Sequence, residues 1–174
     1  MNALAELVAK VAEIDRRMSN MFRHGTVHSV DPAKQTVRLN IGQGDDGPLL
    51  SPPIPYGQIA GALKVHTPPS VGQQMTMMSP SGDPQQSVAV PFTWSNQNQS
   101  PSQSPNENVI TYGGATIKLD GNGLSISKDG VTVSISGNGV TITGGAVKHD
   151  GKSIGKDHKH TDVETGGGQS GPPV

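Results

Sequence analysis

The amino-acid sequence predicts a mainly β protein that begins with one short α-helix. Glycine and proline are abundant, at 23 and 14 of the 174 residues, and valine and isoleucine together far outnumber leucine. This composition favours short strands separated by many turns. Helical periodicity is confined to the first 23 residues, and most of the remaining chain shows the alternation of apolar and polar side chains that is typical of strands.

The composition also limits how the chain can be stabilised and what it can bind. Leu, Ile, Val and Phe make up about a fifth of the residues, which is little for one self-sufficient core, so we expect the chain to share a core with copies of itself. The net charge of -1 argues against an electrostatic nucleic-acid binder, and the lack of cysteine excludes disulfides and thiol chemistry. No apolar run is typical of a membrane span or a secretory signal, so we expect synthesis in the cytosol.

Residues 1–23 carry the helical pattern. The apolar side chains recur at the a/d spacing of a coiled coil, at Leu4, Leu7, Val11, Ile14, Met18 and Met21. In this register Lys10 occupies a g position and Asp15 the following e position, so a neighbouring parallel helix could pair with their charges. The alternative is a single amphipathic helix that lies on its own domain. We expect Gly25 to end the helix.

Residues 24–94 predict a small barrel of the oligonucleotide/oligosaccharide-binding (OB) type. Short alternating runs predict strands at 26–30, 36–41, 62–66, 74–78 and 87–92, with a proline-containing turn at 31–34. Five short strands with Gly and Pro between them suit a partly open barrel of this kind. Because the strands carry few basic or aromatic residues, we expect a scaffold role rather than nucleic-acid binding. Residues 95–108 follow as a polar linker without apolar side chains.

Residues 109–157 repeat a pattern of strand and turn. Apolar residues alternate with Thr, Ser and Lys, which gives each strand one apolar face and one hydroxyl-bearing face. Gly121, Gly130 and Gly139 recur at nine-residue intervals and indicate strands of similar length. Calcium binding of the β-roll type is disfavoured, because Ile126 stands where that repeat supplies a carboxylate.

The same stretch is too short for a β-helix made by one chain. A coil needs about 20 residues, so residues 109–157 would form barely two coils with bare ends. We therefore expect an intertwined trimeric β-helix or prism, in which each chain contributes one wall and the apolar faces meet on a common axis.

His158 and His160 lie in the expected tip and tail, residues 158–174. The two histidines are two positions apart, so in an extended chain both imidazoles point to the same side. One chain offers too few nitrogens for a closed structural metal site, whereas three chains on a threefold axis would offer a complete octahedron. Such a donor set suits Fe²⁺, Ni²⁺ or Co²⁺, and availability favours an iron ion, one per trimer and shared by three chains. The alternative is a solvated histidine pair in a polar tail.

The order of helix, small barrel, polar linker, glycine-punctuated prism and terminal HDGKSIGKDHKH segment resembles the central spike of contractile-tailed bacteriophages, the baseplate assembly protein V family. The residues that carry the resemblance are Asp150-Gly151-Lys152, Ile154-Gly155 and His158-x-His160. The resemblance implies a homotrimer in the virion, at the tip of the tail baseplate. Its OB-like domain would attach to the baseplate hub or tail tube protein, and its needle would pierce the host outer membrane. His158 and His160 of each chain would hold the iron ion, with His149 outside the ligand pair.

Three other readings compete with a phage spike. The related spike of a phage-tail-like bacteriocin has the same expected architecture. A receptor-binding tail fibre or adhesin is also trimeric and β-rich, but such proteins present aromatic side chains to glycans, and the sequence has no Phe, Tyr or Trp after residue 124. A peptidoglycan-degrading enzyme is disfavoured, because the acidic residues show no acid/nucleophile pair. We expect no enzymatic activity, no nucleic-acid partner and no small-molecule substrate.

Overall fold

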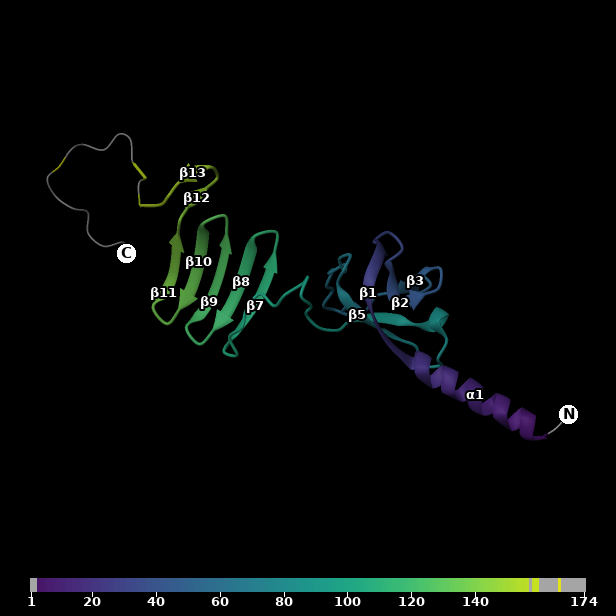
Figure 1. Ribbon diagram of the computed structural model, residues 1–174. Helices are drawn as coiled ribbons and strands as arrows, with labels where there is room; N and C mark the ends of the chain where they lie inside the picture. Colours follow the sequence, from purple (N-terminus) through teal and green to yellow (C-terminus); the bar gives the residue numbers. More distant parts are fainter. Residues whose placement is uncertain (1–2, 157, 160–165, 167–174) are drawn as a thin grey trace. The chain divides into compact units, whose positions relative to one another are not determined.

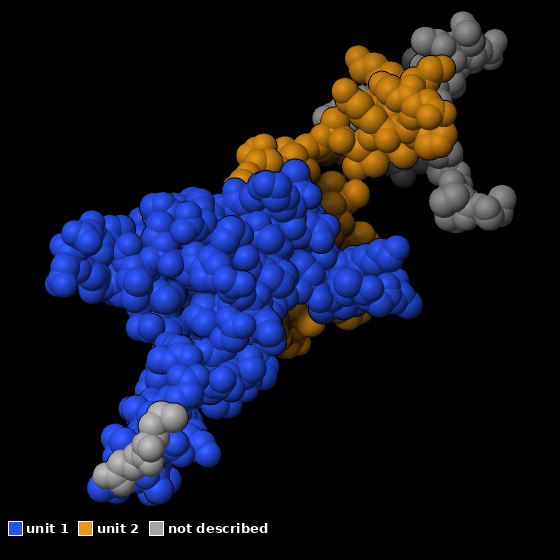
Figure 2. All heavy atoms as spheres, turned by 90° about the vertical axis from the view of Figure 1, so that its right-hand side faces the viewer, with its two compact units in different colours: residues 1–100 blue, residues 101–174 orange. Residues whose placement is uncertain are grey.

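The computed structural model describes residues 3–156, 158–159 and 166, and the chain divides into two compact units, residues 1–100 and 101–174 (Figures 1 and 2). The fold is mainly β, with one N-terminal α-helix and several antiparallel sheets, as the composition predicts. Within the described residues none of the sheets closes on itself.

The N-terminal unit begins with helix α1 (Ala3–Met21), and the chain passes directly into strand β1 (Phe22–Asp31). The expected N-terminal helix is therefore confirmed, but it ends at Met21 and not near Gly25. Residues from Phe22 onward pair with a neighbouring strand, and this ladder replaces the helical hydrogen bonds. Gly25 lies inside β1, where a side chain would overlap the carbonyl oxygen of Asn40.

One six-stranded sheet forms the body of this unit, with the order β3-β2-β1-β5-β6 and with β4 paired to β2 off this path. The other strands are β2 (Thr36–Gly44), β3 (Gly47–Leu50), β4 (Ile54–Pro55), β5 (Gln74–Met78) and β6 (Val88–Pro91). A short 3-10 helix, Pro84–Gln86, precedes β6. A parallel bridge from Tyr56 to Ala89 connects the segment after β4 with β6.

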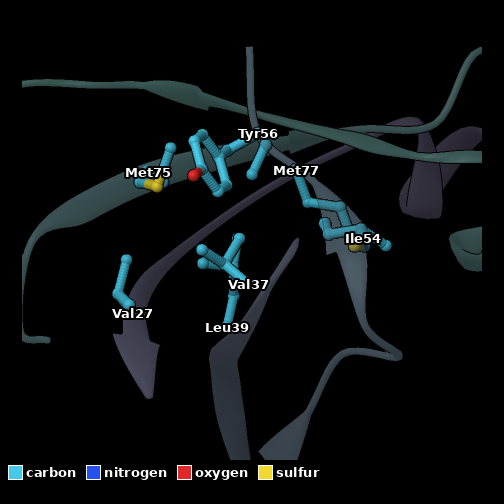
Figure 3. Close-up of a cluster of buried hydrophobic side chains, with 8 residues drawn as sticks. Val27, Val37, Leu39, Ile54, Tyr56, Met75 and Met77 are labelled. Carbon is cyan, nitrogen blue, oxygen red and sulfur yellow. The ribbon is translucent and has the colours of Figure 1, made fainter. Parts of the chain in front are cut away.

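The core of the N-terminal unit gathers side chains from β1, β2, β4, β5 and β6 and from Tyr56, directly after β4, and these side chains point toward one another (Figure 3). The buried residues are Val27, Val37, Leu39, Ile54, Tyr56, Met75, Met77 and Ala89. Alternate positions of one strand supply pairs of them, as expected for strands with one buried face. This core is small but complete, and none of its residues comes from α1.

Four of the five strands expected in this unit are present, as β1, β2, β5 and β6. The prediction of a strand at 62–66 is wrong. That segment has only a bridge between Ala60 and Lys64. The loop is held at its base by Gln58, whose Nε2 donates to the carbonyl oxygen of Thr67 over 2.8 Å and whose Oε1 accepts from the Thr67 amide over 3.2 Å. Hydrogen bonds from the side-chain amide of Gln58 thus take the place of a strand ladder there.

The C-terminal unit contains an antiparallel meander of five strands, in which each strand pairs with the next along the chain (Figure 1). The strands are β7 (Glu107–Tyr112), β8 (Ala115–Asp120), β9 (Gly123–Lys128), β10 (Val131–Ser136) and β11 (Gly139–Thr143). A two-stranded hairpin, β12 (Lys148–His149) and β13 (Lys152–Ser153), follows. The structure thus has the strands expected of one wall; the trimeric prism itself stays a prediction.

The repeat of this meander is eight residues, not the nine suggested by the glycine spacing. Successive strands begin at residues 107, 115, 123, 131 and 139. The nine-residue spacing arises because the glycines sit at different places in successive turns: Gly121 comes first in its turn, Gly130 second, and Gly139 begins a strand. The structural repeat is therefore a strand of up to six residues followed by a two-residue turn.

Candidate self-association face and metal-binding tip

The meander β7–β11 has two chemically different faces. Residues directly opposite each other on paired strands lie on the same face, and the register aligns Ile117 with Ile126, and Ile126 with Val133. One face, called here the apolar face, carries Ile110, Ile117, Leu119, Leu124, Ile126, Val131, Val133, Ile135, Val140 and Ile142. The opposite face, called the hydroxyl face, carries mainly Thr and Ser. The alternation expected from the sequence is confirmed.

The apolar face is not covered within the described chain. No residue of β7–β11 is buried, and every residue of the closed hydrophobic core belongs to the N-terminal unit. The two most exposed of these ten side chains lie on the edge strands, Ile110 of β7 at 67% and Val140 of β11 at 66%. A contiguous apolar surface of this size is typical of an interface with another chain.

Two kinds of tight turn keep the strands equal in length. At one end of the sheet both turn residues have positive φ, as at Asp129 (50°) and Gly130 (86°), which suits a two-residue hairpin. At the other end the side chain of Asp120 accepts a hydrogen bond from the Asn122 amide over 2.8 Å, and Gly123 follows with φ of 141°. Because the turns are short at both ends, the apolar residues stay in rows across the sheet.

A small ionic cluster fixes the hydroxyl face where β7 and β8 meet. The Nζ of Lys118 lies 2.8 Å from a carboxylate oxygen of Asp120 and 3.4 Å from one of Glu107. Glu107 also accepts a hydrogen bond from the Ser102 hydroxyl, which lowers the pKa of Glu107 together with Lys118. The pKa of Asp120 is lowered by Lys118 first and by the Asn122 amide second, and both carboxylates raise the pKa of Lys118.

The expected metal ligands lie beyond the β12–β13 hairpin, and only one of them is among the described residues. The Nδ1 of His158 lies 2.7 Å from the carbonyl oxygen of Gly155, and the His158 amide donates to the same oxygen over 3.1 Å. Because a carbonyl only accepts, Nδ1 donates in this contact, and in the neutral imidazole the lone pair then lies on Nε2. His160 lies outside the described residues. His149, in β12, is largely exposed and lies 3.7 Å from Asp150.

A metal site within one chain is not formed by the part of the chain that the structure describes, since no three His, Cys, Asp or Glu side chains converge there. His160 lies outside the residues to which this statement applies, and a site shared between three chains stays a prediction. The form of His158 is nevertheless the one that metal-ligating histidines usually adopt, with Nδ1–H held by a backbone carbonyl.

A second surface, in the N-terminal unit, was missed by the sequence analysis. The rings of His24 and Phe92 stack with their centroids 4.1 Å apart. Phe92 also lines a hollow of about 390 Å³, together with Gln73, Trp94 and Asn98. Trp94 is 64% exposed. The signal in the sequence was the closeness of Phe92 to Trp94 in a chain with few aromatic residues.

No described helix combines the length and the apolar character that spanning a membrane requires. A scan against protein-family models and a search of curated proteins each find no match to this chain.

Proposed function

We propose that the protein is the homotrimeric, non-enzymatic central spike of a contractile phage tail, which pierces the host outer membrane with a needle made of three β7–β11 sheets. The observation that carries this proposal is the uncovered apolar face of that sheet. A meander with one apolar face cannot be stable in water without a cover, and within the described residues the chain provides none.

Three copies around an axis cover all three apolar faces with the same residues. Burying the exposed half of an Ile, Leu or Val side chain contributes about 1 kcal/mol, so ten such residues give about 10 kcal/mol per chain before the costs of association. The hydroxyl faces would then form the outside of the needle and keep it soluble. A closed, rigid shaft of this kind can transmit the force of sheath contraction to a narrow tip.

The remaining parts of the chain fit the ends of such a spike. The N-terminal unit has its own core and would serve as the OB-like domain that attaches to the baseplate hub or tail tube protein. At the opposite end of the sequence, His158 and His160 of three chains would hold one iron ion. The proton on Nδ1 of His158 supports this assignment, because it directs Nε2 to the metal. When bound, the ion would join the three chain ends.

The oligomeric state gives the first test. Light scattering of the full chain should give about 54 kDa, three times the 18.0 kDa of one chain. Ile126→Asp places a charge on the apolar face of the central strand β9 and should abolish the trimer. Ser127→Asp, on the hydroxyl face of the same strand, should leave it intact. A mass of one chain for the unaltered protein, or a trimer that tolerates Ile126→Asp, would contradict the proposal.

The location in the particle gives the second test. Antibodies against the full chain should label the tip of the baseplate of contractile tails produced by cells that carry the gene, and nothing else on the particle. Labelling of side fibres would favour the adhesin. Particles that carry labelled tips but no heads would identify a bacteriocin spike instead of a phage spike.

One observation favours a second candidate, the receptor-binding fibre or adhesin. Exposed Trp94 and Phe92 beside the amides of Gln73 and Asn98 form a surface of the kind that contacts sugars. This function predicts saturable binding to host cells. Binding that purified lipopolysaccharide competes away and that is lost in Trp94→Ala would establish it.

A further inference from the structure

Helix α1 has an apolar stripe that its own unit leaves uncovered. None of its residues is buried, and Val11 and Ile14, in the middle of the stripe, are each 57% exposed. The packing of α1 against the rest of the unit uses another side of the helix: Gly82 lies against the backbone of Arg17, and Arg16 and Arg17 line a hollow with the loop before the 3-10 helix. An amphipathic helix lying on its own domain would bury the stripe, so that alternative is wrong.

The stripe is wider than the a/d seam alone. Leu4, Val11 and Met18 occupy a positions, Leu7, Ile14 and Met21 occupy d positions, and Val8 adds an apolar e position that is 61% exposed. Apolar residues at a, d and e are typical of helices that face more than one partner in a bundle. The stripe therefore suits two neighbouring helices better than one.

The charges on α1 distinguish between parallel and antiparallel partners. Glu13 forms ion pairs within its own helix. Its carboxylate oxygens lie 2.8 Å from the Nε of Arg16 and 2.6 Å from the Nε of Arg17, and these contacts lower the pKa of Glu13 to about 2. Within the described chain, Lys10 and Asp15 form no ion pair. In a parallel coiled coil a g position faces the following e position of the next helix, so Lys10 would face Asp15 of the partner subunit. In an antiparallel pair g would face g and e would face e, and like charges would meet.

We propose that α1 forms a parallel three-stranded coiled coil with the α1 helices of two further copies of this chain. The number of copies rests on the proposed trimer, whereas the parallel pairing rests on the stripe and its charges. The coil would add a second contact between the three chains, but with fewer than three heptads it is too short to hold them together without the C-terminal sheet. It would also stabilise a 19-residue helix that is marginal by itself in water.

The absence of cysteine from the chain allows a direct test in the full-length protein. Leu7→Cys places a thiol in the seam, and Ala9→Cys, at an f position of the same turn, places one on the outside. After mild oxidation, about two thirds of the Leu7→Cys chains should appear as disulfide-linked dimers, because a trimer with one thiol per chain leaves one chain unpaired. Ala9→Cys should give few dimers. Equal yields from the two variants would overturn the coiled coil.

Charge reversal provides a second measurement that does not need a seam substitution. Lys10→Glu and Asp15→Lys should each lower the melting temperature of the helical circular-dichroism signal, and the double variant should restore it. No change in the single variants, or no rescue in the double variant, would overturn the pairing. Light scattering separates the two proposals: a trimeric mass without Leu7→Cys dimers rejects the coil alone, whereas a monomeric mass rejects the trimeric spike.

Discussion

Lys118 makes the stability of the C-terminal unit dependent on pH. The pKa of Glu107 is lowered by the Ser102 hydroxyl first and then by Lys118, and the pKa of Asp120 is lowered mainly by Lys118, so both carboxylates are more easily ionised in the folded protein than in the unfolded chain. Their contribution is present above the unfolded pKa values, near 4, and is lost as the pH falls through the lower folded values.

We therefore expect the melting temperature of the sheet to fall between neutral pH and about pH 3. In Lys118→Met this decrease should be smaller, because the cation that favours the ionised carboxylates is gone. Thermal unfolding followed by circular dichroism at several pH values measures the difference. Identical pH profiles for the two proteins would show that the cluster does not contribute.

His158 and His149 make a matched pair for testing the metal site. Protein prepared without a histidine tag should contain about one iron ion per three chains. His158→Ala should remove it, whereas His149→Ala should retain it, because His149 lies in β12 and belongs to no histidine pair. Both variants should keep the trimeric mass. One ion per chain, or iron that persists in His158→Ala, would contradict a site shared on the threefold axis.

At the scale of single elements, the β8–β9 turn needs glycine at position 123 but not at position 121. Gly123 has φ of 141° and lies against the carbonyl oxygen of Ile135, so an added Cβ would overlap it. Gly121 has open space around its Cα. Gly123→Ala should lower the free energy of unfolding by about 1–3 kcal/mol, and Gly121→Ala should change it by less than about 0.5 kcal/mol. Urea unfolding measures both; equal effects would show that the turn adapts.

The elements differ in how well the sequence predicts them, for physical reasons. Strand β5 was predicted at its observed bounds, Gln74–Met78, because an alternating run between turn residues has little freedom. The helix α1 was predicted from its spacing, but its end depended on the long-range pairing of Phe22 with Met78, which spacing does not reveal. The loop at 62–66 has strand composition, yet the Gln58–Thr67 hydrogen bonds decide its shape.

Of the candidate site, the faces of the sheet were predictable from the sequence, whereas the features that depend on long-range contacts were not. The two faces of the β7–β11 sheet follow directly from alternation, and the structure confirms them. The proton position on His158 depends on where the Gly155 carbonyl lies, so only the structure could supply it. The hollow beside Trp94 requires residues from three separate stretches of the chain, 70–74, 91–94 and 98–99, and no local pattern joins them.

For the whole molecule, the thermal unfolding of the two units should depend differently on protein concentration. The sheet β1–β6 of the N-terminal unit has a core of its own, to which α1 contributes no residue, so the midpoint of the transition of this sheet should not depend on protein concentration. The described part of the C-terminal unit has no buried core, so its transition should move to higher temperature as the concentration rises. Leu39→Ala, in the N-terminal core, should cost about 2–5 kcal/mol in the first transition only. Calorimetry at several concentrations tests this, and a single concentration-independent transition would contradict it.

The eight-residue repeat of the meander constrains how the length of this sheet can vary among related chains. Adding one repeat extends the sheet by one strand spacing, about 4.8 Å, and reverses the end from which the chain leaves toward the β12–β13 hairpin. Adding two repeats restores the exit point and lengthens the sheet by about 10 Å. Insertions and deletions that preserve the tip should therefore come in even numbers of strands.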